Sequence, residues 1–367
     1  MIDSLTPAEK VRYNRHLILD EFGEDNQVKL KTAKVLVVGA GGLGAPVLQY
    51  LTAAGVGTIG IVDGDEVDES NLQRQVIFAE TDIGKLKSEA AMMSLLKQNA
   101  HIKFESHSVY LTIDNALDII RDYDLVVDGT DNFQTRYLVN DACVILKKPL
   151  VFGSIFKFEG QVSLFNWEEG PTYRCLYPDP PKGNEVPNCS EIGVLGVLPA
   201  VIGSIMANEV IKVITGIGQN LSGRLLLYHA LDMTFKELKF NKNAPQVTEL
   251  LPDYDVFCGV EETPNSIDVQ ELKLWMDEGR KFQLIDVREA HELLICKLES
   301  DHLPLSNIHE KHSVTRQDRP VVVYCHHGMR SQSAINFLTS KGYENLINLE
   351  GGIHAWANKI DHTTAVY

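Results

Sequence analysis

Apolar runs alternate with amphipathic stretches along the first two thirds of the chain, and glycines separate them. Residues 34–38 and 58–62 read as short buried strands, and the helix predicted between them, residues 42–54, ends at Gly55. The pattern then predicts a helix over residues 88–98 and a strand over residues 124–128. This alternation indicates an α/β domain with a doubly wound, mostly parallel sheet and helices on both faces.

Flanking segments extend this domain. Thr6-Pro7-Ala8-Glu9 form a capping box, with proline at the first helical position, and predict one helix running through Arg12, Arg15 and Leu19. Residues 161–240 add strands and a strongly apolar helix over residues 197–214. The uncharged stretch 35–62 is long enough to cross a bilayer, but seven glycines and a proline divide it into strand, turn, helix and strand.

Periodicity is lost over residues 241–265, which contain three prolines. A shorter α/β pattern follows, with strands predicted at residues 282–286, 321–324 and 346–349. We therefore expect a first domain over residues 1–240, a linker over 241–265 and a second, smaller α/β domain over 266–367.

Composition narrows the class of protein. The chain has 367 residues, 44% of them hydrophobic, which suits two globular domains. Its net charge of −16 disfavours a nucleic-acid partner, which would select for a basic surface. The polar N-terminus lacks an apolar signal core, and six cysteines show no dense disulfide pattern, so we expect a cytoplasmic protein with no membrane partner.

A glycine-rich loop follows the first strand of the larger domain. It reads Gly39-Ala40-Gly41-Gly42-Leu43-Gly44 and opens a helix, so that its N–H groups and the helix N-terminus favour a phosphate. Asp63 ends the next strand, where a carboxylate can bind ribose hydroxyls. These features predict a Rossmann-like nucleotide site, and alone they also fit a nicotinamide-dependent dehydrogenase.

Charged residues after Asp63 favour a different chemistry. Adenylation needs cations, to stabilise charge moving onto pyrophosphate, and a carboxylate for magnesium. The candidates are Asp65, Asn71, Arg74, Gln75, Lys87 and Asp131. Arg74 and Lys87 could also be members of surface ion pairs, and neither alone would indicate a site.

Several motifs in this order resemble those of the sulfur-carrier-protein adenylyltransferases of molybdopterin and thiazole synthesis. These enzymes are relatives of the ubiquitin-activating enzymes. The resemblance spans roughly residues 12–240 and rests on Arg12-Tyr13-Asn14-Arg15, the glycine loop, Asn71-Leu72-Gln73-Arg74-Gln75, Thr130-Asp131-Asn132, Tyr173-Arg174-Cys175-Leu176 and Gly193-Val194-Leu195-Gly196. It implies that ATP and Mg²⁺ are used and that the substrate is a small ubiquitin-like sulfur-carrier protein ending in Gly-Gly.

The same resemblance implies individual roles. Asp63 would bind the ribose, Arg74 and Lys87 the phosphates, and Asp131 the magnesium, while Asn71 and Gln75 would line the site. Arg15 would reach the triphosphate of a neighbouring subunit, which implies a homodimer. Without the resemblance, Arg15 reads as part of a solvated helix face.

Cysteines depart from the pattern of that family. Its members often bind structural zinc through two Cys-x-x-Cys pairs, but here Thr172 accompanies Cys175 and Asp255 accompanies Cys258, so we predict no zinc. Residues 172–190 are the candidate for a loop that covers the product. Cys189 within them resembles a cysteine that links covalently to the carrier, and it reads equally well as a spectator thiol.

The smaller domain carries a thiol between a strand and a helix. The segment is Cys325-His326-His327-Gly328-Met329-Arg330-Ser331, where loop N–H groups, the helix N-terminus and Arg330 would stabilise an anionic sulfur. Residues 266–360 resemble the rhodanese sulfurtransferases, which implies a persulfide on Cys325. A cysteine phosphatase is the alternative, but it places five residues between cysteine and arginine, and here there are four. Residues 295–305 depart from the usual rhodanese sequence.

Together the two domains predict an enzyme that adenylates the terminal glycine of a carrier and converts it into a thiocarboxylate through the Cys325 persulfide. An upstream donor such as a cysteine desulfurase would supply the sulfur. The related pathways are molybdopterin, thiamine-thiazole and tRNA sulfur chemistry. A dehydrogenase and a non-catalytic scaffold that docks the carrier remain as alternatives.

Overall fold

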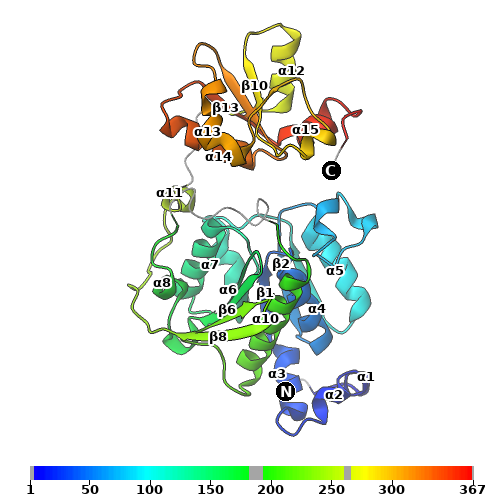
Figure 1. Cartoon of the computed structure of the whole chain (residues 1–367). Helices are drawn as coiled ribbons and strands as arrows, with labels where there is room; N and C mark the ends of the chain where they lie inside the picture. Colours follow the sequence, from blue (N-terminus) through cyan, green and yellow to red (C-terminus); the bar gives the residue numbers. More distant parts are fainter. Residues whose placement is uncertain (1–3, 182–192, 260–265, 366–367) are drawn as a thin grey trace. The chain divides into compact units, whose positions relative to one another are not determined.

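The computed structural model describes residues 4–181, 193–259 and 266–365 (Figure 1). The chain divides into two compact units, Met1–Val260 and Glu261–Tyr367. Each unit is built on its own sheet, of eight strands in the first and five in the second.

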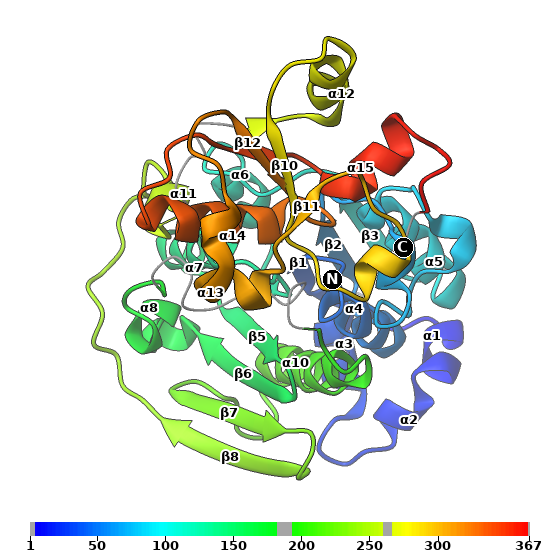
Figure 2. The ribbon, with the colours of Figure 1, turned by 45° about the horizontal axis from the view of Figure 1, so that its top comes forward.

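The sheet of the first unit has the order β3-β2-β1-β4-β5-β6-β7-β8. Five neighbouring strands are parallel: β3 (Lys103–His107), β2 (Thr58–Val62), β1 (Lys34–Val38), β4 (Leu125–Asp128) and β5 (Leu150–Phe156). Three antiparallel strands extend it, β6 (Glu159–Phe165), β7 (Arg224–His229) and β8 (Thr234–Lys239), and Figure 2 shows them side by side. The predicted doubly wound sheet is therefore confirmed, with an antiparallel edge.

Helices cover both faces of this sheet. One face is packed by α3 (Gly23–Thr32), α4 (Gly44–Ala54), α5 (Lys87–Gln98) and α10 (Val197–Thr215), and the other by α6 (Ala116–Arg121), α7 (Phe133–Ile145), α8 (Tyr173–Leu176) and α11 (Tyr254–Phe257). Successive residues of β1 face opposite sides of the sheet. Val35 and Val37 belong to the hydrophobic core that contains α4 and α10, whereas Leu36 and Val38 belong to the core that contains α6 and α7. Strands buried on both faces lose the polar alternation of a surface strand.

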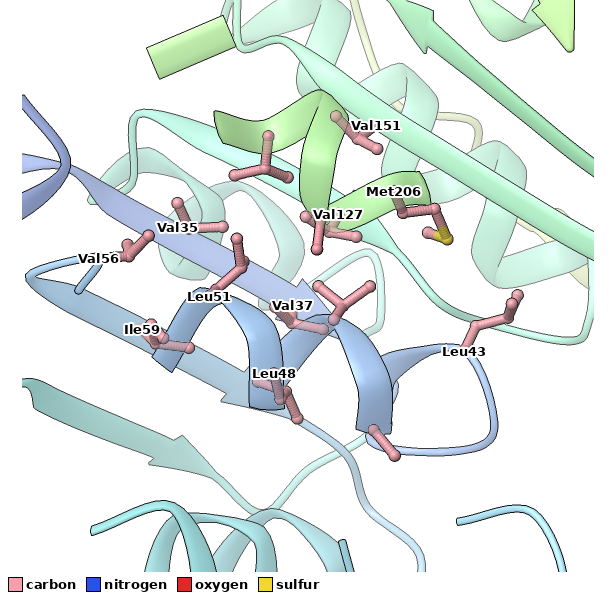
Figure 3. Packing of buried hydrophobic residues seen from close by; sticks show 14 of the residues in the cluster. Val35, Val37, Leu43, Leu48, Leu51, Val56, Ile59, Val127, Val151 and Met206 are labelled. Atoms are coloured by element: carbon pink, nitrogen blue, oxygen red, sulfur yellow. The ribbon is translucent and has the colours of Figure 1, made fainter. Parts of the chain in front are cut away.

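The core between α4, α10 and β1 is shown in Figure 3. Leu48 and Leu51 of α4 and Met206 of α10 are fully buried there, against Val35 and Val37 of β1. Among the described residues, α10 is the one helix long and apolar enough to cross a membrane. It packs on α4 and on β5 and β6, so its apolar surface fills the interior of the first unit.

Two segments differ from the sequence prediction. The N-terminal capping box is present, but the single predicted helix is two, α1 (Pro7–Arg12) and α2 (Asn14–Leu17). Tyr13 separates them because its buried hydroxyl accepts a hydrogen bond from Asn99 Nδ2 at 2.9 Å, which turns the chain towards the core. In the predicted linker, α11 packs on α7, where the Tyr254 hydroxyl donates to Asp141 at 2.7 Å.

The second unit has a parallel sheet of order β11-β10-β12-β13-β9. Its strands are β9 (Ser266–Ile267), β10 (Gln283–Asp286), β11 (Asp301–His302), β12 (Val321–Tyr324) and β13 (Leu346–Leu349). On one face lie α13 (Ile308–Lys311) and α14 (Met329–Ser340), and on the other α12 (Val269–Asp277) and α15 (Gly352–Lys359). Residues 295–305, which depart from the rhodanese pattern, supply the edge strand β11.

The packing of α4 gives a first prediction. Leu48→Ala should lower the free energy of unfolding of the first unit by about 2–5 kcal/mol, because it leaves a cavity between α4 and the sheet. Native-state hydrogen exchange of the β1 amides in the full chain measures this loss. Met93→Ala, on an α5 side chain that is 56% exposed, is the control and should change it by less than about 0.5 kcal/mol. Equal losses in the two variants would contradict the assigned packing.

Candidate functional site

A cavity of about 510 Å³ opens at the carboxyl ends of β1, β2 and β4. The strand order reverses between β1 and β4, and ligands of such sheets bind at this reversal. Nine residues that the sequence singled out line the cavity: Gly39, Gly41, Gly42, Asp63, Asp65, Arg74, Gln75, Lys87 and Asp131. Three that it also singled out, Arg15, Gly44 and Asn71, are not among the lining residues.

Close backbone contacts require the glycines of the loop after β1. Gly39 has φ +90°, and a Cβ there would come within 3.0 Å of the Gly129 carbonyl oxygen. A Cβ on Gly44 would come within 1.8 Å of the Gly39 carbonyl oxygen, so Gly44 closes the turn beneath the cavity. Because α4 begins at Gly44, the positive end of its helix dipole lies at the loop and favours an anion, although Ala45 and Val47 already donate to the Gly41 and Leu43 carbonyls and Pro46 has no N–H.

Asp63 and Asp65 form the acidic side of the cavity. Asp63 accepts the Ala40 and Asp65 N–H groups at 2.8 and 2.9 Å, and burial raises its pKa despite the positive charge of Lys87. Asp65 pairs with the Lys87 ammonium at 2.9 Å and accepts the Tyr110 hydroxyl at 2.7 Å. Burial raises the pKa of Asp65, but these two partners outweigh it and hold the pKa below its usual value. The same hydrogen bond raises the pKa of Tyr110 to about 12.

Arg74 and Gln75 enter the cavity from the turn after the 3-10 helix Glu69–Asn71. Arg74 Nη1 donates to the Ser70 carbonyl at 3.0 Å, which leaves other guanidinium donors for a ligand. The Oε1 atom of Gln75 is buried and has no partner among the described residues. Asn71 instead accepts the Asp68 N–H at 3.3 Å, so its side chain holds the turn.

The loop that carries Asp131 is fastened by a buried ion pair. Asp128, at the end of β4, accepts the Thr130 N–H at 2.9 Å and hydroxyl at 2.6 Å, and it lies 3.5 Å from Arg136 Nε. Arg136 in turn donates to the Thr130 carbonyl at 2.8 Å. Burial raises the pKa of Asp128, and Arg136 opposes that rise. Asp131 itself is exposed at the cavity, where its carboxylate can take a cation.

Sequence reasoning missed several lining residues. Tyr110 and Arg136 line the cavity, as do Gln161, Tyr173 and Tyr177 from its far side. Tyr173 belongs to the Tyr173-Arg174-Cys175-Leu176 motif, but that motif alone predicts no role for it. Arg136 follows the Thr130-Asp131-Asn132 motif by one helical turn. Tyr110 had no local signal, because it reaches Asp65 across 45 positions of sequence.

Arg15 lies on α2, exposed to solvent. Cys175 and Cys258 are buried free thiols. Burial raises the pKa of Cys175, but backbone N–H groups of Thr172 and Asn243 outweigh it and lower the pKa, whereas burial raises the pKa of Cys258 to about 11. Cys189 and about half of the predicted covering loop, residues 182–190, lie outside the described residues; residues 173–176 of that loop form α8.

Cys325 in the second unit follows β12 directly and is 1% exposed. Its Sγ accepts the Gly328 N–H at 3.1 Å and lies 3.5 Å from Ser331 Oγ. Gly328 has φ +98°, and a Cβ there would come within 3.2 Å of the Leu349 carbonyl oxygen. The loop then enters α14, so that the Gly328 N–H, the Ser331 hydroxyl and the start of that helix favour an anion on the sulfur.

Two arginine–carboxylate pairs border this loop. Arg330 makes a bidentate pair with Glu292 at 2.6 and 2.7 Å. The Glu292 carboxylate therefore offsets the positive charge of Arg330, which the sequence predicted would stabilise the anionic sulfur of Cys325. Arg288 is fully buried and pairs with Asp286 at 2.6 Å, at the end of β10. The donors that contact Cys325 Sγ come from the loop and the start of α14, namely the Gly328 N–H and the Ser331 hydroxyl.

Histidines complete the loop. His326 and His327 follow Cys325, and His354 of α15 joins them, with ring centroids 4.1 to 5.4 Å apart. Burial, and then the charges of His327 and His354, lower the pKa of His326 to about 4. The imidazole of His326 is therefore neutral at physiological pH.

Comparison with known proteins matches each unit to a protein family. Residues 13–249 match the ThiF family, and residues 268–359 match the rhodanese-like domain. The chain is 47% identical to the probable adenylyltransferase/sulfurtransferase MoeZ of Mycobacterium tuberculosis, over 99% of this chain and 97% of that one. It is 41% identical to the adenylyltransferase and sulfurtransferase MOCS3 of Aedes aegypti, over 100% of this chain and 91% of that one.

Solved structures share the fold of the first unit. The structure of E. coli MccB with ATP superposes with a TM-score of 0.57 and 24% identity, over 65% of this chain and 74% of that chain. PaaA superposes with a TM-score of 0.56 and 23% identity, over 66% of this chain and 77% of that chain. The family matches favour neither a dehydrogenase nor a cysteine phosphatase. With its nucleotide cavity at the carboxyl ends of the sheet and its cysteine loop in the second unit, the chain belongs to the ThiF family and ends in a rhodanese-like domain.

Proposed function

We propose that the first unit adenylates the C-terminal glycine of a small ubiquitin-like sulfur-carrier protein, and that Cys325 then carries sulfur to the activated carboxyl as a persulfide. One observation carries the adenylation: the glycine loop meets Arg74, Lys87 and the carboxylates of Asp63, Asp65 and Asp131 in a single cavity at the strand reversal. The relatives named adenylyltransferase and sulfurtransferase, which align over nearly the whole chain, support both halves of the proposal.

ATP fits the residues of the cavity. Asp63, held in place by two N–H groups, would accept the ribose hydroxyls, and the first turn of α4 would face the phosphates. The buried Oε1 of Gln75 needs a hydrogen-bond donor, which a bound ligand would supply. Asp131 would hold Mg²⁺, whose chemistry is to neutralise the charge that develops on the phosphates.

In the reaction, a carboxylate oxygen of the carrier attacks the α-phosphorus, and the bond to the β-phosphate oxygen breaks to release pyrophosphate. Attacking group and target are both anions, so their approach depends on cations. Arg74 has donors available at the cavity, and Lys87 would exchange its partner Asp65 for a phosphate oxygen. Tyr173, Tyr177 and Gln161, on the far side of the cavity, would face the carrier tail.

Sulfur transfer follows on the acyl-adenylate. The outer sulfur of the Cys325 persulfide attacks the carbonyl carbon, AMP leaves, and an acyl disulfide forms. A second thiol then attacks the Cys325 sulfur, the carrier leaves as a thiocarboxylate, and a disulfide remains on Cys325. The Gly328 N–H and the start of α14 would stabilise the persulfide anion before it attacks. A sulfur donor such as a cysteine desulfurase would load Cys325.

A homodimer belongs to the proposal because Arg15 does not line the cavity of its own chain. Arg15 is exposed on α2 and would reach the triphosphate of a second copy. The pathway served, whether molybdopterin, thiamine-thiazole or tRNA sulfur chemistry, follows from the carrier that the cavity accepts. A cytoplasmic enzyme suits these thiol steps, which need a reducing compartment.

Asp131→Ala tests the adenylation. Exchange of pyrophosphate into ATP, measured on the full chain with carriers ending in Gly-Gly, should require the carrier and fall by about 100-fold or more in the variant. Asp118→Ala removes a carboxylate that is exposed on α6 and should leave the rate unchanged. Exchange in the Asp131→Ala variant at the parental rate would sink the magnesium role, and exchange that no carrier stimulates would sink the proposed substrate.

Cys325→Ser tests the sulfur step separately. Thiocarboxylate formation on the carrier, followed by mass spectrometry, should be lost, while pyrophosphate exchange should persist because the cysteine lies outside the nucleotide cavity. Cys296→Ser changes another thiol of the second unit and should preserve both activities. Thiocarboxylate formed at the parental rate by Cys325→Ser would show that another group carries the sulfur.

A further inference from the structure

Three histidines meet beside the cysteine loop of the second unit. His326 and His327 follow Cys325, and His354 lies in the first turn of α15. The backbone holds the two segments together, because the His354 N–H donates to the His326 carbonyl at 3.0 Å and the Ile353 N–H donates to the Cys325 carbonyl at 2.9 Å. The close approach of the three rings is therefore built into the fold.

Each ring offers one nitrogen, and the three nitrogens lie within 4.8 Å of one another. They are the one such group of potential metal ligands in the part of the chain that the structure describes. The Nδ1 atom of His354 is buried and has no hydrogen-bond partner among those residues. A buried imidazole nitrogen without a partner is costly unless something binds it.

We propose that His326, His327 and His354 bind a single divalent transition-metal ion, of which zinc is the type. Imidazole nitrogen is a preferred ligand of zinc, copper and nickel, and three imidazoles leave a fourth position of the tetrahedron open to water or an anion. A zinc–nitrogen distance of about 2.0–2.1 Å places two ligands of one ion about 3.3 Å apart. His327 is exposed, and a change in the orientation of its ring would close the remaining separation.

The surrounding charges permit a cation at this position. Arg330 follows the loop, but its guanidinium forms a bidentate pair with Glu292, whose carboxylate offsets the repulsion. The site lies outside the adenylation cavity, so it does not depend on the function proposed for the first unit.

A bound ion would act on the cysteine loop. It would link the loop after β12 to α15 through side chains, in addition to the two backbone hydrogen bonds. Two of its ligands directly follow Cys325, which carries the persulfide in the function proposed above. We therefore expect metal occupancy to restrain the loop and to slow the loading or discharge of Cys325.

Calorimetric titration of the full, chelator-treated chain with Zn²⁺ tests the site. One ion should bind, and His354→Ala should weaken this binding by at least about 10–100-fold, the loss typical of removing even an outer partner of a ligand. His327→Ala is the second variant, because the residue is exposed and its loss should not disturb folding. His309→Ala, an exposed histidine on α13, is the control and should bind as the parent does.

Thiols must be separated from imidazoles in this test. Co²⁺ in place of Zn²⁺ should give visible absorption without a sulfur-to-cobalt band in the near ultraviolet, and Cys325→Ser should leave it unchanged. Circular dichroism of each variant confirms that it is folded. Failure of the parent to bind, unaltered affinity in the folded His354→Ala and His327→Ala variants, or a sulfur-to-cobalt band lost in Cys325→Ser would each overturn the proposal.

Discussion

The reversal of strand order between β1 and β4 is the constraint on which the nucleotide cavity depends. Connections leave these two neighbouring strands in opposite directions, so the loops at their carboxyl ends part and leave a space. The loops still approach each other closely where Gly39 meets Gly129. Side chains at this contact would force the loops apart and shift the glycine loop that Asp63 holds through the Ala40 N–H.

Both units anchor their functional loop in the same way. A strand ends in a buried aspartate, Asp128 in the first unit and Asp286 in the second, and each pairs with a buried arginine. Burying such pairs costs solvation energy that their attraction only partly offsets, so they are weak evidence for stability. Their hydrogen bonds instead select one conformation for the backbone that follows, which carries Asp131 in one unit and borders the cysteine loop in the other.

The sequence allowed much of this to be predicted because the strongest signals are local. Apolar runs located the central strands, and glycines located the loops beside Cys325 and after β1. Contacts between residues far apart in the sequence could not be predicted. Examples are the hydrogen bond of Tyr110 to Asp65 and that between Tyr13 and Asn99, which divides the first helix. The helix α11 was not predicted because it is only four residues long and its packing partner, Asp141, lies 113 positions away, although Asp253 caps it locally. The pairing of Arg330 with Glu292 is also a long-range contact. The sequence shows that Arg330 is charged but does not show which residue pairs with it.

The packing of α10 on α4 has a consequence during synthesis on the ribosome. The apolar face of α4 is complete at Ala54, but the helix that covers it starts at Val197, about 140 residues later. At about 5–20 residues per second, that interval lasts roughly 7–30 s. During this time Leu48 and Leu51 lack their partner in the nascent chain, which makes the emerging first unit a client for chaperones that shield apolar surface.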